Sequence, residues 1–153
     1  MKSNGLINTV IILIMAILGV IGYKLAPTLL PNADLTLPAK FCNPGLNICS
    51  STLPDGGRLE FSISPQPILS LQTLKLDITI DNLTAERIEI DFDGSQMKMG
   101  YNRPLLSGSN NHFTGQTMLP VCITGSMEWT ATVLVTTHNR RIAIPFNFTV
   151  AGR

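Results

Sequence analysis

Charged side chains are scarce in this chain. Lysine and arginine together number 11 and aspartate and glutamate 10 among 153 residues, so the net charge is +1 and charged residues make up only 14% of the chain. A protein that binds nucleic acid needs a concentrated positive surface to neutralise phosphates. No basic cluster occurs, and none adjoins the apolar N-terminal segment. We therefore expect no nucleic-acid partner.

Residues arranged for catalysis are also lacking. The two histidines, His112 and His138, each follow or precede an asparagine in a predicted turn, and neither has the spacing of a metal site. No serine nucleophile elbow occurs, and a turn explains the glycines of residues 55–57 better than a phosphate-binding loop does. We therefore expect a protein that is not an enzyme.

Long hydrophobic runs are absent except for one, from Leu6 to Gly22, which contains no charged residue. A helix over residues 6–25, at about 1.5 Å per residue, spans roughly the 30 Å hydrocarbon core of a bilayer. A cleaved signal peptide is the alternative, but residues 19–26 lack the pair of small residues typical of a cleavage site. The sequence therefore predicts a retained transmembrane anchor over residues 6–25, with residues 1–5 in the cytoplasm.

The three cysteines, Cys42, Cys49 and Cys122, all follow the apolar run. Turn residues lie between the first two, so a local Cys42–Cys49 disulfide is the simplest interpretation. Cys122 is then a free, buried thiol, and its pairing with Cys42 or Cys49 is the alternative. A structural disulfide persists only in an oxidising compartment. We therefore expect a single-pass protein of the bacterial inner membrane, with its N-terminus in the cytoplasm and its domain in the periplasm.

After Gly57, apolar and polar residues alternate with a period of two, a pattern that is typical of strands with one buried face. Residues 26–39 contain three prolines and no sustained period, so they are predicted to be an extended periplasmic tether. Six or seven short strands in residues 40–153 favour an all-β domain, an immunoglobulin-like β-sandwich. The positions predicted to face its core are Leu59, Phe61, Ile63, Leu74, Leu76, Ile78, Ile80, Ile88, Ile90, Phe92, Trp129, Ala131, Val133, Val135, Ile142, Ile144, Phe146 and Phe148.

Sulfur-bearing side chains recur in the second half of this domain, at Met97, Met99, Met118, Cys122 and Met127. Thioethers and thiolates are the ligands that select Cu(I), and period-two spacing puts the first two methionines on one face. These five residues are therefore candidate copper ligands at one end of the sandwich. The alternative is that the methionines fill the end of the core beside Trp129.

The same region resembles the FixH and YtkA-like group. The resemblance rests on the segments Gly94 to Gly100 (GSQMKMG), His112 to Gly115 (HFTG), Leu119 to Ala131 (LPVC, then Gly, Met, Trp and Ala) and Pro145 to Phe148. It implies a membrane-anchored immunoglobulin-like domain outside the cytosol, with a role in the assembly of haem-copper cytochrome oxidases alongside copper delivery. Cys122 departs from the group, in which many members have methionine at this place, and the Cys42–Cys49 loop has no counterpart that we can match.

Two functions are open at this point. The first is a membrane-anchored accessory protein that assists cytochrome oxidase assembly or copper handling, with oxidase subunits or copper chaperones as partners. The second is a metal-free structural subunit or interaction module of a membrane respiratory complex. A thiol-disulfide oxidoreductase that uses Cys122 is disfavoured, because no close cysteine pair or adjacent basic group activates that thiol.

Overall fold

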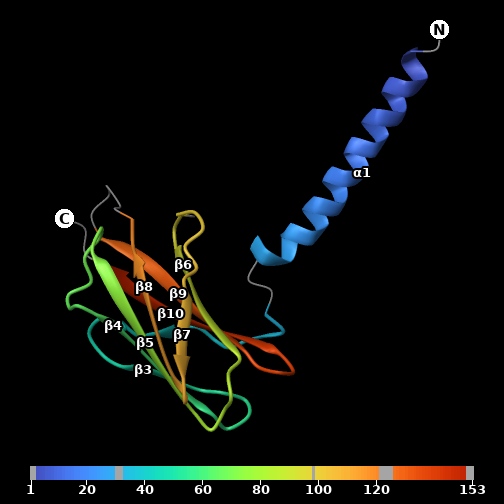
Figure 1. Cartoon of the computed structure of the whole chain (residues 1–153). Helices are drawn as coiled ribbons and strands as arrows, with labels where there is room; N and C mark the ends of the chain where they lie inside the picture. The colour runs from blue at the N-terminus through green and yellow to red at the C-terminus, as the bar shows by residue number, and fades with distance from the viewer. Residues whose placement is uncertain (1–2, 30–32, 98, 121–125, 151–153) are drawn as a thin grey trace. The chain divides into compact units, whose positions relative to one another are not determined.

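The computed structural model describes residues 3–29, 33–97, 99–120 and 126–150. The chain divides into two compact units, Met1–Asn32 and Ala33–Arg153. Helix α1 (Ser3–Leu29) forms the first unit, and the described part of the second contains ten strands (Figure 1). The second unit is therefore an all-β domain, as the sequence predicts.

Helix α1 contains 27 residues, and its large apolar side chains are exposed wherever they are described. The structure describes the side chains of α1 at Gly5 and at residues 7–23. Within the described residues, no helix is long and apolar enough to cross a membrane. The transmembrane anchor over residues 6–25 stays a prediction.

The ten described strands of the domain form a single curled sheet. Their order is β1-β10-β9-β6-β7-β8-β5-β4-β3, with β2 also paired to β10. Among the described residues, β1 and β2 both pair in parallel with β10, and the other strand pairs are antiparallel. The strands are β1 (Leu35–Thr36), β2 (Lys40–Phe41), β3 (Cys49–Thr52), β4 (Arg58–Ser64), β5 (Thr73–Asp81), β6 (Arg87–Gly94), β7 (Leu105–Ser109), β8 (His112–Met118), β9 (Met127–Thr136) and β10 (Arg141–Val150).

The core lies between the two halves of this curled sheet. The rings of Phe61 on β4 and Phe146 on β10 have centroids 5.9 Å apart, although these strands are not neighbours in the sheet. The two halves therefore face each other. All the positions that the alternating pattern predicts to face inward are buried. This confirms that part of the prediction, because a strand buries every second side chain when one of its faces is covered.

The structure differs from the extended tether predicted over residues 26–39, because residues 26–29 belong to α1 and a later part of the range pairs with β10. Leu35 and Thr36 pair with β10, and on either side Asp34 N donates to Arg141 O (2.8 Å) and Leu37 N to Ala143 O (2.9 Å). These bonds satisfy the outer edge of β10, which would otherwise expose unpaired backbone groups. The spacing of apolar residues in the sequence does not reveal such a segment, because it is bonded to β10 through its backbone.

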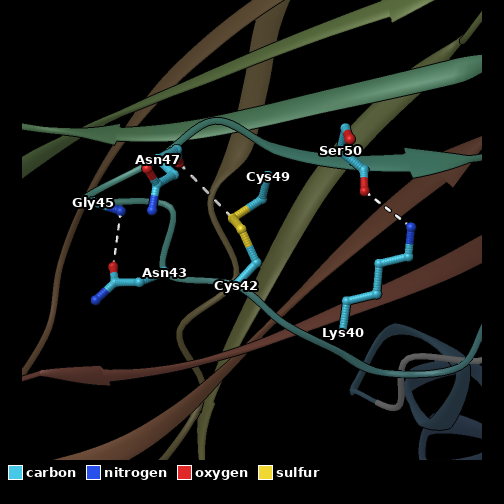
Figure 2. The surroundings of a disulfide bond; sticks show 7 residues. All are labelled: Lys40, Cys42, Asn43, Gly45, Asn47, Cys49 and Ser50. Carbon is cyan, nitrogen blue, oxygen red and sulfur yellow. Dashed lines mark hydrogen bonds between the residues drawn. A yellow bond between two sulfur atoms is a disulfide. The ribbon is translucent and has the colours of Figure 1, made fainter.

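The disulfide joins Cys42 to Cys49, as predicted, and links the two ends of the strand order (Figure 2). Cys42 N donates to Asn147 O on β10 (3.0 Å), whereas Cys49 begins β3, which pairs with β4. Lys40 Nζ adds a hydrogen bond to Ser50 O (3.0 Å) beside it. The disulfide therefore connects the edge strands of the two sheet halves.

Replacing both Cys42 and Cys49 with alanine will lower the free energy of unfolding by about 2.5 kcal/mol, because a short closed loop restricts the unfolded chain. The measurement is urea denaturation of the full chain in detergent, followed by Trp129 fluorescence. A reductant should destabilise the wild type and a Cys122→Ala control equally. An unfolding midpoint that does not respond to reductant would contradict the structural role of the bond.

Candidate functional site

Four of the five predicted sulfur ligands lie at one end of the all-β domain, where β6 and β8 end and β9 begins; these strand ends lie at the top of the domain in Figure 1. Met97 and Met99 follow β6, Met118 ends β8 and Met127 begins β9. We call this end, formed by residues 43–48, 65–72, 94–97, 99–104, 118–120 and 126–127, the methionine end. Cys122 lies outside the described residues.

Met99 and Met127 meet at Gly94. A Cβ atom placed on Gly94 would lie 2.1 Å from Met127 Cε and 3.2 Å from Met99 Cγ. The two side chains therefore occupy the space that a side chain at this position would fill. Met127 is buried, with 6% of its surface exposed, and Met99 packs against the core while partly buried. Both the copper prediction and the core-filling alternative place these two methionines together.

Met97 and Met118 differ from this pair because they lie on the surface. Their exposed fractions are 51% and 48%. Asn102 ties the segment after β6 to the end of β8: its Nδ2 donates to Met118 O (3.0 Å), and its Oδ1 accepts from Thr117 Oγ1 (2.8 Å). The methionine end therefore combines two shielded and two exposed thioethers.

The segment that carries Met97 and Met99 is held by polar contacts to β6. Asp93 Oδ1 accepts hydrogen bonds from Gly94 N (3.0 Å) and Met99 N (3.4 Å). Arg103, whose side chain is only 3% exposed, pairs with Asp91 across 3.3 Å between Nε and Oδ1. The Tyr101 ring lies over the Arg103 guanidinium, 5.2 Å from its Cζ to the ring centroid. These contacts fix the segment on both sides of its methionines.

The methionine end also exposes large apolar side chains, which sequence reasoning did not single out. Leu46, Leu71 and Tyr101 are 61%, 59% and 64% exposed. Residues 43–48, 65–72 and 118–120 contain no Asp, Glu, Lys, Arg or His, whereas the sequence of residues 94–104 contains Lys98 and Arg103. The signal was present in the sequence as the loops 43–48 and 65–72, which contain apolar residues and no charge, a combination that marks interaction surfaces.

The opposite end of the domain, where the chain enters it at Ala33, is polar. Arg140 pairs with Asp55, and His138 Nδ1 lies 3.3 Å from Glu86 Oε1. A hollow of about 440 Å³ opens among these loops. His112, at the start of β8, contacts Asp77 with 2.8 Å between Nε2 and Oδ2.

Metal-binding groups of the common kind are missing from the described residues. Within those residues, no three His, Cys, Asp or Glu side chains gather closely enough to hold a metal ion. The sulfur of methionine is therefore the donor that the methionine end offers, and it is a soft ligand.

Comparison with known proteins adds little to this geometry. No family model matches the chain, and no curated protein matches it. Among solved structures, the chain is similar to a DUF4785 family protein from Legionella pneumophila subsp. pneumophila, with a TM-score of 0.37 and 14% sequence identity. The match covers 63% of this chain and 28% of that protein.

Proposed function

We propose that this chain is a membrane-anchored accessory protein that binds Cu(I) at its methionine end and assists cytochrome oxidase assembly or copper handling. The observation that carries the proposal is the meeting of Met99 and Met127 at Gly94, with Met97 and Met118 on the same end. Thioethers are neutral, soft ligands that select Cu(I) over harder divalent ions. The protein acts by reversible binding and not by catalysis.

The disulfide supports a place outside the cytosol, because such a bond persists in an oxidising compartment. The uncharged run from Leu6 to Gly22 supports an anchor in the bacterial inner membrane. The N-terminus then lies in the cytoplasm and the all-β domain in the periplasm. The resemblance to the FixH and YtkA-like group agrees with this arrangement and suggests oxidase subunits or copper chaperones as partners.

We assign the all-β domain to the immunoglobulin-like sandwiches on the basis of strand order. In the constant-type fold, strands A, B, E and D form one sheet and C, F and G the other. The order β4-β5-β8-β7 corresponds to A-B-E-D, and β6-β9-β10 corresponds to C-F-G. Trp129 lies on β9, the F position, and not on the C strand where antibody domains carry their buried tryptophan. The methionine end is then opposite the end that carries the B–C and F–G loops.

The test is an anaerobic Cu(I) titration of the full chain in detergent, with its Cys42–Cys49 disulfide intact, against a chromophoric Cu(I) chelator. Met99→Leu and Met127→Leu should each weaken binding about tenfold, the equivalent of about 1.4 kcal/mol. Leucine keeps the side-chain volume and removes the sulfur. Met15→Leu on α1 is the matched control and should leave the affinity unchanged. Absence of copper uptake, or equal affinities in all three variants, would remove the copper function.

The exposed apolar side chains of the methionine end favour one second candidate, a metal-free interaction module of a membrane respiratory complex. Leu46, Leu71 and Tyr101 provide a surface of the composition found at protein interfaces, which are rich in aromatic residues and methionine. The same titration separates the two functions, because an interaction module takes up no copper.

A further inference from the structure

The four described methionines of the all-β domain differ in their access to solvent. Met97 and Met118 are 51% and 48% exposed, whereas Met127 is 6% exposed and Met99 packs against the core. Access of an oxidant to sulfur controls how fast a methionine is oxidised. The two exposed thioethers should therefore react before the two shielded ones.

We infer that Met97 and Met118 are sites of reversible oxidation to methionine sulfoxide by a peroxide. The thioether sulfur attacks one oxygen of hydrogen peroxide, the O–O bond breaks, and the second oxygen leaves as water after proton transfer. The sulfur loses two electrons and gains an S–O bond, while the peroxide is reduced. A methionine sulfoxide reductase reverses the change by returning two electrons and releasing the oxygen as water.

The surroundings make this modification consequential. The methionine end exposes the large apolar side chains of Leu46, Leu71 and Tyr101, and its one charged side chain among the described residues, Arg103, is 3% exposed and paired with Asp91. Sulfoxide formation converts an apolar side chain into a strongly polar one and disrupts methionine-rich interfaces. Two sulfoxides would therefore place new polar groups on an end that exposes large apolar side chains.

Oxidation then lowers the affinity of the methionine end for Cu(I), a step that rests on the proposed function. A sulfoxide binds metals through a harder oxygen, which suits Cu(I) less well than a thioether does. Met99 and Met127 stay reduced at this stage, because they are shielded. Oxidation of the two exposed methionines therefore precedes that of the shielded pair, and it leaves the packing of Met99 and Met127 at Gly94 intact.

The order of oxidation is tested by exposing the full chain in detergent to hydrogen peroxide and mapping each methionine by peptide mass spectrometry. We expect Met97 and Met118 to oxidise at least about tenfold faster than Met127. In urea all the methionines should react at similar rates, which shows that the fold and not the local sequence sets the order. Equal rates for Met118 and Met127 in protein with native Trp129 fluorescence would overturn the inference.

The regulatory step is tested on the same samples by Cu(I) titration before peroxide, after peroxide, and after treatment with both methionine sulfoxide reductases. We expect about a tenfold loss of affinity that the reductases restore. If the reduced protein takes up no copper, the proposed function fails while the mapped oxidation order stands. If oxidised and reduced protein bind copper equally well, the regulatory inference alone is wrong.

Discussion

Replacing Trp129 with alanine will lower the free energy of unfolding by about 4 kcal/mol, within the range measured for large aromatic side chains removed from a core. Trp129 is only 2% exposed and is the largest of the fully buried side chains. Its neighbours across the sheet are Phe148 on β10 and Gly94 on β6. Loss of the indole leaves a cavity that these strands cannot close, because their backbone pairing holds them apart.

The measurement is urea denaturation followed by circular dichroism, since the variant has lost the one tryptophan of the chain. Trp129→Phe is the matched variant, and it should lose only about 1–2 kcal/mol because a ring still fills most of the space. A loss below about 1 kcal/mol for Trp129→Ala would show that the indole does not support the core.

The sequence predicts the inward positions of the strands well because burial and period-two alternation have the same cause. In β5, Leu74, Leu76, Ile78 and Ile80 are all buried while their neighbours are more exposed, which is the pattern that the sequence shows directly. The disulfide was predictable for a similar reason, since turn residues between Cys42 and Cys49 bring the two thiols together locally.

The methionine end was predictable only as a group of residues. Their position after β6, at the end of β8 and at the start of β9 follows from antiparallel pairing, which brings these strand ends together. Which sulfurs are shielded depends on Gly94, whose missing side chain makes room for Met99 and Met127. A glycine that ends a strand gives no sign of this in the sequence, because its neighbours across the sheet are remote along the chain.

Long-range polar contacts were beyond the sequence for the same reason. Arg103 and Asp91 lie 12 residues apart on different segments, and nothing in either neighbourhood pairs them. The apolar loops at 43–48 and 65–72 likewise meet only because the fold brings them to one end, where a Cβ atom placed on Gly45 would lie 2.3 Å from Ile68 Cγ1. Periodicity predicts which face a residue occupies and does not predict which loops become neighbours.

Replacing Asp91 with alanine will lower the free energy of unfolding by about 3 kcal/mol, because it leaves the Arg103 guanidinium buried without its carboxylate. The Arg103 side chain is 3% exposed, and it contacts Asp91 through two bonds, at 3.3 Å from Nε and 3.5 Å from Nη2. The Tyr101 ring compensates only in part, since Tyr101 is 64% exposed and a cation–π contact at an exposed site is worth about 0.5–1 kcal/mol. Urea denaturation followed by Trp129 fluorescence measures the effect.

The matched control is the exposed pair between Arg58 and Glu60, whose side chains are 61% and 36% exposed. Glu60→Ala should cost no more than about 1 kcal/mol, because water screens such a pair. The double variant Asp91→Leu with Arg103→Met should recover most of the lost stability, since apolar residues of similar size can replace a buried pair. Equal losses in Asp91→Ala and Glu60→Ala would show that the pair does not anchor the segment that carries Met97 and Met99. A larger loss at Asp91, accompanied by faster oxidation of Met99, would tie the stability of this pair to the shielding of the methionine end.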